Sequence, residues 1–306
     1  QACFLLRDVN WGPARQAISE RHPARKGPEM ARGIAFRWNH ADDFAAENPQ
    51  KLVIDMQEAI AELVAMWSFV VIGCGVACGH GATDGETRLL VAFAFGMAIL
   101  VLAYAVGHLS GGQINCAVTF SLVLGGQITW YQGIFNTVFQ LVGSILGALF
   151  LSALFPCEMD MTGNLASNVV GKRFGANRAL MGEAFGTFLL CLVVWETAVS
   201  KKSQAGVNAC LAIGFAVFLA HLVLLPIDGC SINPTRSFGP AVVAQLLRSE
   251  CDNFAEGGLD DLWVTWAGPL MGATAAAMLK HAFAPKSQPE QEPKPDPSIK
   301  YMVADE

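Results

Sequence analysis

Two short stretches of the sequence carry an asparagine in the same setting. Asn115 and Asn233 each follow an isoleucine and precede three variable residues, a hydroxyl residue and a phenylalanine. The second stretch also contains Arg236, in an apolar region without an obvious neighbouring acid. Asparagine amides donate and accept hydrogen bonds, and a charged side chain in apolar surroundings normally faces a polar path. The repeated motif therefore predicts a polar site built from two related halves.

The repeat extends to one glutamate ahead of each asparagine. Glu62 precedes Asn115 by 53 residues, and Glu183 precedes Asn233 by 50. Both glutamates lie inside apolar runs, where an ionisable side chain is a candidate for a functional or structural role. The similar spacing predicts that each half uses its glutamate in the same way.

The composition of the chain indicates the environment in which these motifs lie. The chain has 306 residues, of which 53% are hydrophobic and 15% charged, whereas a soluble domain carries about 25% charged residues. Apolar stretches of about 20 residues, long enough to cross a bilayer core of about 30 Å, recur at 52–79, 87–107, 131–155, 179–199, 206–227 and 261–284. We expect an all-α membrane protein with six transmembrane helices. Buried helices of a large soluble protein are the alternative.

Each half contains three spans, with the glutamate in the first span and the asparagine between the second and third. Three is an odd number, so the halves enter the membrane in opposite senses, which is an inverted repeat with its site near the midplane. The stretches from Asn115 to about Gly125 and from Asn233 to about Leu247 are too short to cross. The glycine-containing runs before them, 107–112 and 228–231, are expected to be non-helical. We therefore expect two re-entrant half-helices rather than surface loops.

The distribution of basic residues predicts on which side of the membrane the two termini lie. Basic residues gather before the first span, after the fourth and at the end of the sixth, which predicts that both termini are cytoplasmic. Basic residues in the connection at 172–178 oppose this orientation. The expected organisation is a flexible N-terminal tail at 1–51, a membrane domain at 52–284 with repeats at about 52–155 and 179–284, and a disordered tail at 285–306. Met30 is a possible initiator. The membrane itself, plasma or internal, is not indicated.

Other classes of site leave no signature. The nine cysteines form no matched CxxC pairs, so we expect neither a metal site nor a disulfide framework. Whether Cys157 and Cys251 pair is left open. His108, His221 and Asp228 show no pattern with a nucleophile or a metal ligand set, and no basic patch with aromatic residues indicates nucleic acid. We expect neither an enzyme nor a nucleic-acid-binding protein.

Over residues 52–284 the chain resembles the major intrinsic protein family, which contains the aquaporins and glycerol channels. The family's hallmark is a pair of Asn-Pro-Ala boxes that cap half-helices meeting at the membrane centre. The resemblance is carried by Glu62, the run from Gly107 to Gly111, Asn115, Glu183, Gly229, Cys230, Asn233, Pro234 and the run from Arg236 to Pro240. Cys116 replaces the first proline and Thr235 the second alanine. Proline presets the first helical φ, so Cys116 is expected to weaken the start of its half-helix.

The resemblance implies an aquaporin-like fold and a passive water channel that excludes protons and ions, without a cofactor. It also implies a homotetramer in the lipid bilayer with one pore per subunit. Asn115 and Asn233 are expected to cap the half-helices and to donate hydrogen bonds to water at the midplane. The ladder of water-accepting backbone carbonyls is expected at Gly111, Gly112, Gln113, Ile114, Gly229, Cys230, Ser231 and Ile232.

The resemblance places the narrowest point at Phe95, His221, Cys230 and Arg236. Phe95 and His221 would fill the lumen, while His221 and Arg236 would supply hydrogen-bond donors to water. Glycerol channels carry a small residue at the histidine position and an aspartate after the arginine, and here these positions hold His221 and Ser237. This combination predicts a water-selective filter.

Three alternatives follow from the same residues. The two deviant boxes are compatible with a broader pore that passes hydrogen peroxide, ammonia or small neutral solutes. Glu62 and Glu183 are compatible with a proton-coupled transporter. The favoured interpretation is that Glu62 and Glu183 accept hydrogen bonds from the non-helical backbone, with His108 in the same scaffold on the cytoplasmic side.

Overall fold

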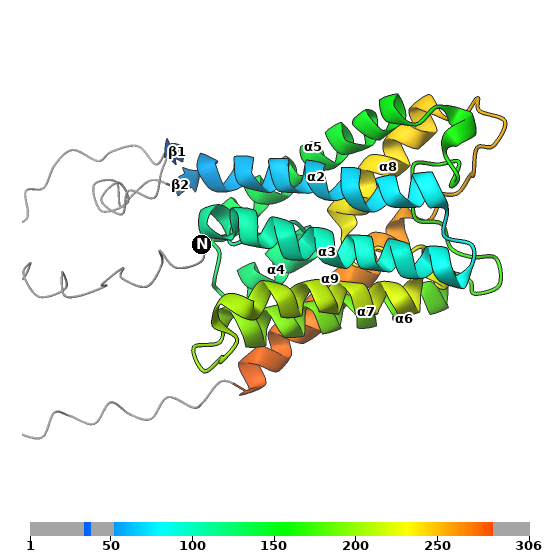
Figure 1. The fold of residues 1–306 in the computed structure, drawn as a ribbon. Helices are drawn as coiled ribbons and strands as arrows, with labels where there is room; N and C mark the ends of the chain where they lie inside the picture. The colour runs from blue at the N-terminus through cyan, green and yellow to red at the C-terminus, as the bar shows by residue number, and fades with distance from the viewer. Residues whose placement is uncertain (1–33, 38–51, 284–306) are drawn as a thin grey trace, which may run out of the picture.

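The computed structural model describes residues 34–37 and 52–283 (Figure 1). The predictions of flexible tails and of an initiator at Met30 fall outside these residues. Ahead of the helices, strand β1 (Ile34–Arg37) pairs in parallel with β2 (Leu52–Asp55). The sequence analysis predicted no strand here. Strand β2 is joined to the helices because the Asp55 N–H donates to Gln132 Oε1 at 2.7 Å and Gln132 Nε2 donates to Asp55 O at 3.0 Å.

Six long helices form the body of the protein. They are α2 (Met56–His80), α3 (Gly85–Ser110), α5 (Trp130–Leu154), α6 (Ala176–Val194), α7 (Ala209–Asp228) and α9 (Leu262–Phe283). Helix α6 continues as the π-helical turn η2 (Trp195–Val199), and the 3₁₀ turn η3 (Gly206–Asn208) leads into α7. Six helices in the described residues are long and apolar enough to span a membrane. The expectation of six spans is confirmed.

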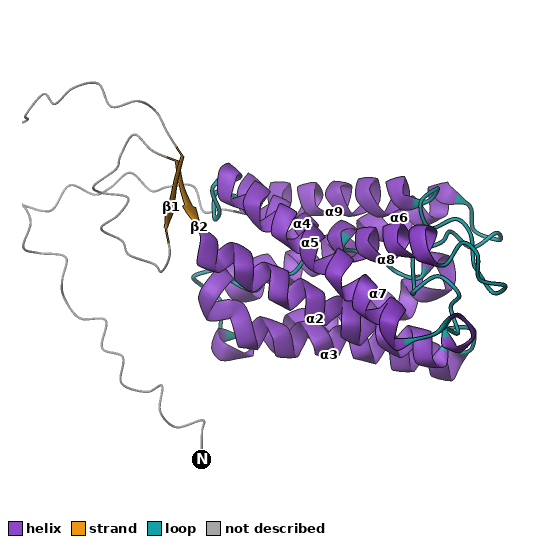
Figure 2. Cartoon of the chain, turned by 90° about the horizontal axis from the view of Figure 1, so that it is seen from above, coloured by secondary structure: helices purple, strands orange, loops and turns teal. Residues whose placement is uncertain are grey.

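Two shorter helices begin directly after the repeated asparagines. Helix α4 (Cys116–Leu124) and helix α8 (Pro234–Leu247) start near the middle of the bundle and run toward opposite ends of it (Figures 1 and 2). They match the predicted re-entrant half-helices.

The preceding segments correct one expectation. Residues 107–110 are helical as the last turn of α3, and Asp228 is the last residue of α7. Helix α3 ends only at Gly111 (φ 84°) and α7 only at Gly229 (φ 82°), which are left-handed caps. Glycine inside 107–110 is therefore tolerated in the helix, and the non-helical segments are shorter than predicted.

The half-helices tie the two repeats together. Helix α2 packs on α5, α6 on α9 and α3 on α7, whereas α4 of the first repeat contacts α9 and α8 of the second contacts α5. Close approach of α8 to α5 needs Gly239, because a Cβ there would lie 2.3 Å from the backbone of Ser144. Each half-helix thus rests partly on a helix of the other repeat.

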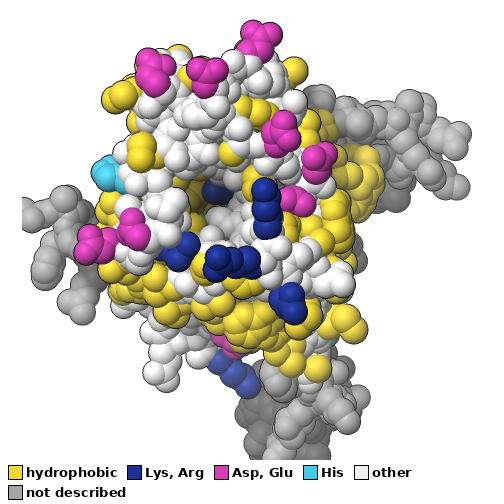
Figure 3. Space-filling view, turned by 90° about the vertical axis from the view of Figure 1, so that its right-hand side faces the viewer, with side chains coloured by type: hydrophobic (Ala, Val, Ile, Leu, Met, Phe, Trp, Pro, Cys, Tyr) yellow, Lys and Arg dark blue, Asp and Glu magenta, His cyan; other side chains and the backbone are white. Residues whose placement is uncertain are grey.

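The loops between α5 and α6 and between α8 and α9 meet at one end of the bundle. The first contains the 3₁₀ turn η1 (Cys157–Met159), and a disulfide joins Cys157 to Cys251 in the second. The Asn253 side chain also donates to Cys157 O at 2.7 Å. The open question about this cysteine pair is thereby answered. Figure 3 shows this end hollowed near its centre, with basic side chains beside the hollow and acidic ones farther out.

Candidate functional site

The two asparagines meet at the centre of the bundle and are almost completely buried. Each Oδ1 accepts an N–H bond from the first turn of its own half-helix. Each Nδ2 crosses to the other repeat: Asn115 donates to Ile232 O and Asn233 donates to Ile114 O, both at 2.7 Å. An amide NH₂ has two hydrogens. One hydrogen of each asparagine is therefore used between the repeats, which leaves the other for a permeant.

Glu62 anchors the segment before Asn115. Its fully buried carboxylate accepts hydrogen bonds from Ser110 Oγ at 2.6 Å, Gln113 N at 2.9 Å, Ile114 N at 2.7 Å and Gln140 Nε2 at 2.8 Å. Four donors fill the accepting capacity of a carboxylate. This arrangement is that of a structural acceptor.

Glu183 anchors the segment before Asn233 in the same way. It accepts from Ser231 N at 2.7 Å and Ile232 N at 2.6 Å. His108, by contrast, lies on the exposed side of the last turn of α3. The structure brings Glu62 and Glu183 to the loops as predicted and leaves His108 outside this hydrogen-bonded scaffold.

The anchored segments have an unusual backbone. Ile114 and Ile232 have φ values of 50° and 45°, and Cys230 has 55°. Such values are rare for a side chain with a branched Cβ and cost of order 1–3 kcal/mol each. The glutamate bonds to the two isoleucine N–H groups offset this cost. Of the predicted carbonyl ladder, Ile114 O and Ile232 O are already used by the asparagine amides.

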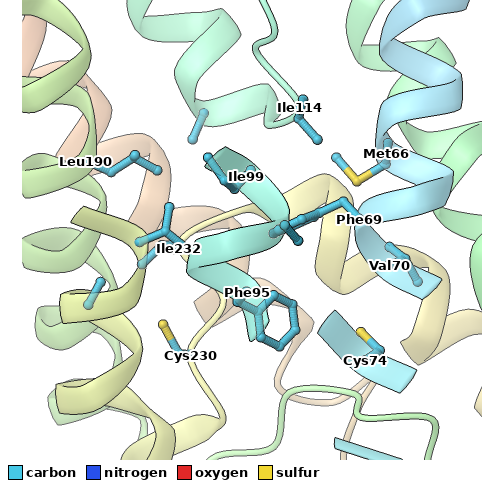
Figure 4. Packing of buried hydrophobic residues seen from close by; sticks show 14 of the residues in the cluster. Met66, Phe69, Val70, Cys74, Phe95, Ile99, Ile114, Leu190, Cys230 and Ile232 are labelled. Atoms are coloured by element: carbon cyan, nitrogen blue, oxygen red, sulfur yellow. The ribbon is translucent and has the colours of Figure 1, made fainter. Parts of the chain in front are cut away.

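The four predicted filter residues lie together. The Phe95 and His221 rings stack with centroids 4.5 Å apart, and Arg236 Cζ lies 4.8 Å from the Phe95 centroid. Figure 4 shows the Phe95 ring between Cys230 and Cys74. All four filter residues are at most 2% exposed. The predicted cluster is therefore assembled, and its aromatic rings fill the space between the helices.

Room for Phe95 comes from a glycine on α2. A Cβ at Gly73 would lie only 2.2 Å from the Phe95 ring. The filter ring thus depends on a position that no sequence motif marks.

The hydrogen bonding of His221 corrects part of the prediction. His221 Nδ1 lies 2.9 Å from Val217 O, a group that only accepts, so Nδ1 carries the hydrogen. In neutral imidazole the other nitrogen, Nε2, then accepts rather than donates. Within the described residues His221 Nε2 and Arg236 Nε are buried without a protein partner. The filter therefore offers water an acceptor beside a donor, not two donors.

Cavities lie on both sides of the filter. One of about 50 Å³ is lined by Asn115 and Asn233 together with Gly111, Gly112, Gln113 and Ser231, among others. The other, of about 290 Å³, is lined by Phe95, Asp228, Gly229 and Arg236 and by residues of the long loops. The asparagine pair thus lines one solvent-sized space and two filter residues line the other, and backbone segments of the predicted ladder line both.

Several side chains of the site were missed by the sequence analysis. Asn168 is the main one, since its Oδ1 accepts from Arg236 Nη1 and from Ser237 Oγ while its Nδ2 donates to Asp228 O at 3.1 Å. It lies between the two repeats, so no repeated motif marks it.

The two departures from the family's boxes also proved to be linked. The Cys116 N–H, which proline would lack, donates to Thr235 Oγ1 at 3.3 Å. Thr235 in turn donates to Asn233 Oδ1 at 2.7 Å. The prediction considered each substitution alone and did not foresee this contact.

A family model described as Major intrinsic protein matches residues 50–280. The chain belongs to the major intrinsic protein family. Within this family it is 37% identical to Aquaporin-5 of Ovis aries over 224 residues, which cover 73% of this chain and 79% of that relative. It is 36% identical to Aquaporin PIP2-7 of Arabidopsis thaliana over 256 residues, which cover 78% and 88%. Six apolar helices and these relatives make it an integral, multi-pass membrane protein.

Solved structures support the same fold. An X-ray structure of the aquaglyceroporin from Plasmodium falciparum aligns with a TM-score of 0.63 at 18% identity, covering 73% of this chain and 94% of that one. At this identity the likeness concerns the fold alone. It agrees with the predicted arrangement of six spanning helices and two half-helices.

Proposed function

We propose that this member of the major intrinsic protein family is a passive water channel that excludes protons and other ions. The observation that carries the proposal is that the crossed asparagine pair lines one cavity, while Phe95 and Arg236 of the filter line a second. Aquaporins among its relatives support the same conclusion.

Ion exclusion follows from the charges along this path. Helices α4 and α8 both begin at the centre, and each helix N-terminus carries about half a positive charge. Arg236, which is only 2% exposed to solvent, adds a full positive charge. A water bound by the free amide hydrogens of Asn115 and Asn233 must accept with its oxygen, so its own hydrogens point away along the pore. Proton hopping through that water is interrupted, and a cation meets a repulsive field.

Selection against larger solutes follows from the packing of the filter. The stacked Phe95 and His221 rings, with Arg236 beside them, narrow the proposed path to water-sized molecules. Ser237 after the arginine is fully engaged with Asn168 and Ser231 and does not extend the polar surface of the filter. A carbon skeleton such as that of glycerol therefore meets aromatic walls.

The same proposal covers topology and assembly. The two ends of the described helical domain lie at the same end of the bundle (Figure 1), and basic residues flank that end, so both termini are cytoplasmic. The subunits form a homotetramer in which each has its own pore, and the protein has no catalytic cycle. Protease protection in sealed vesicles tests the orientation, and mass measurement in detergent tests the tetramer.

Transport is tested by stopped-flow light scattering on proteoliposomes. Under an osmotic gradient, shrinkage should be fast, with a low activation energy, and should not depend on a proton gradient. Glycerol uptake by the same vesicles should be slow, and peroxide uptake distinguishes a broader pore. Slow water flux or strict coupling to pH would sink the proposal and favour a transporter that uses Glu62 and Glu183.

The filter is tested separately by His221→Gly. Removing the imidazole takes away one of the two stacked rings, so glycerol uptake should rise while water flux persists. Phe218→Leu, in a partly buried side chain on the same helix outside the filter, is the matched control. Unchanged glycerol uptake in the His221 variant would place the narrowest point elsewhere.

A further inference from the structure

Asp228 occupies the place in the second repeat that Ser110 occupies in the first. Ser110 is the last residue of α3 and Asp228 is the last residue of α7. Each is followed by a left-handed glycine cap, Gly111 or Gly229. The two side chains are both buried, at 8% and 2% exposure. A hydroxyl in one half thus corresponds to a carboxyl in the other.

Ser110 makes two hydrogen bonds of opposite sense. Its Oγ accepts from Gly112 N at 3.1 Å and donates to Glu62 Oε1 at 2.6 Å. A hydroxyl does both because it carries one hydrogen and two lone pairs. The side chain therefore links the start of the loop to the glutamate that holds the rest of it.

Asp228 reproduces the first of these bonds. Its Oδ1 accepts from Cys230 N at 3.0 Å, which is the counterpart of the bond from Gly112. Its Oδ2 is buried, and within the described residues it receives no donor. Because Ser110 contacts Glu62, the same place in the second repeat puts the Asp228 carboxyl beside that of Glu183, whose influence it feels. Two ionised carboxylates are acceptors only, so such a contact needs a proton.

We propose that Asp228 and Glu183 share one proton, and that the Asp228 carboxyl O–H donates to Glu183 as the Ser110 hydroxyl donates to Glu62. The pair then holds three successive N–H groups, with Cys230 bonded to Asp228 and Ser231 and Ile232 bonded to Glu183. Asp228 is thus a positioning residue for the filter loop. The inference deepens the proposed function and depends on it only in naming that loop the filter.

No neighbouring charge within the described residues takes the place of this proton. Arg236 on α8 acts on both acids at a distance, but its guanidinium donates to Asn168 Oδ1, and in the described part of the chain no ion pair joins it to either carboxyl. Asp261, before α9, adds a further negative charge while its Oδ2 accepts from Val170 N at 2.7 Å. Two buried like charges in contact cannot both ionise cheaply, and such pairs keep one proton between them.

The remaining titratable neighbours do not take over the role. Cys230 lies near enough to both acids to feel their charge, and His221 on α7 uses Nδ1 as a donor to its own helix. Within the described residues neither side chain is hydrogen-bonded to Asp228 or Glu183. The donor that Oδ2 lacks is therefore supplied by the acid pair itself.

Infrared difference spectroscopy of the full chain in lipid tests the proton directly. The wild-type-minus-Asp228→Asn spectrum at neutral pH should contain a protonated-carboxyl C=O band that shifts in D₂O. Asp261→Asn is the matched control and should leave that band in place. A difference spectrum without the band overturns the proposal. Because the spectrum needs no transport, a channel without water flux but with the band would refute only the proposed function.

Rescue in transport supplies the second readout. Asp228→Asn can accept from Cys230 and donate to Glu183, and Asp228→Ser restores the side chain of the first repeat. Both should retain wild-type water permeability, whereas Asp228→Ala should lose it severalfold. If the asparagine variant fell to the level of the alanine variant, the negative charge itself would matter, and the shared proton would be refuted.

Discussion

The two repeats hold the same backbone turn with different donors. In the first repeat, Glu62 accepts from two backbone N–H groups and from the side chains of Ser110 and Gln140. In the second, Glu183 accepts two backbone N–H groups and faces Asp228. The left-handed positions and the paired N–H bonds are shared, while the side chains around them differ. Internal symmetry thus specifies the turn, and each half completes it locally.

A second difference between the repeats concerns the side chains on and just after these turns. At the third position after its asparagine, the first repeat has Val118 and the second has Arg236. The second repeat also has Cys230 at a left-handed position where the first has Gly112. Asn168, from the loop between the repeats, bonds to Arg236, Ser237 and Asp228, which all belong to the second repeat. The second repeat therefore supplies His221, Cys230 and Arg236 to the proposed filter, whereas the first supplies only Phe95.

The largest expected effect comes from removing that asymmetry with Arg236→Val, which copies the first repeat. Loss of the buried charge should raise proton and cation leak by about tenfold or more, equivalent to a barrier lowered by about 1.4 kcal/mol. A pH-sensitive dye trapped in proteoliposomes measures the leak, and Val118→Ala is the control. If Arg236→Val remained as tight as wild type, exclusion would reside in the symmetric asparagine pair alone.

The second-largest effect is expected when Glu62 or Glu183 is replaced by glutamine. In Glu62→Gln, the new NH₂ group faces a backbone N–H, of Ile114 or of Gln113, that donates to Glu62 in the wild type. Each buried orphan costs about 1–3 kcal/mol. Glu183→Gln loses fewer bonds and can donate to Asp228. Thermal unfolding in detergent should therefore show a larger drop in Tm for Glu62→Gln, with exposed Glu86→Gln as control. Equal drops would contradict the difference between the anchors.

A smaller effect is expected from Asn168, whose side chain bonds only to the second repeat. Asn168→Ala removes the acceptor for Arg236 and Ser237, so the guanidinium should become mobile and water permeability should change severalfold. Asn164→Ala is a matched control, because this buried asparagine of the same loop donates to Ala255 O instead. Stopped-flow permeability compares the two variants. Similar effects from both would mean that the loop acts through its general packing rather than through Asn168.

The contrast between the repeats also explains what sequence reasoning could reach. The spans, the half-helices, Asn115, Asn233 and the glutamates recur in both halves, and the repetition made them visible. Asn168 lies between the halves and Gly73 contacts Phe95 across helices, so only three-dimensional packing reveals them. The extra helical turn at 107–110 was missed because glycine was interpreted as a helix breaker, although the left-handed cap comes only at Gly111.

Which side chains of the site donate hydrogen bonds and which accept them could likewise not be predicted from the sequence. That His221 Nε2 is an acceptor follows from the bond of Nδ1 to the carbonyl of Val217, one helical turn away. The role of Asp228 depends on the carboxyl that it faces. Residue type predicts which atoms a side chain offers, whereas the neighbour across the fold decides in which sense they are used.

The smallest predicted effect tests whether the two deviant boxes form one unit. Cys116→Pro removes the N–H that donates to Thr235 Oγ1, and Thr235→Ala removes the acceptor. Each single variant loses the same hydrogen bond, so the double variant should lose less stability than the sum of the two. The coupling should be about 0.5–1.5 kcal/mol, the net value of one hydrogen bond. Unfolding free energies from a double-mutant cycle measure it. A coupling of zero would mean that the cysteine and the threonine are tolerated independently, and that the repeats interact here through their asparagines alone.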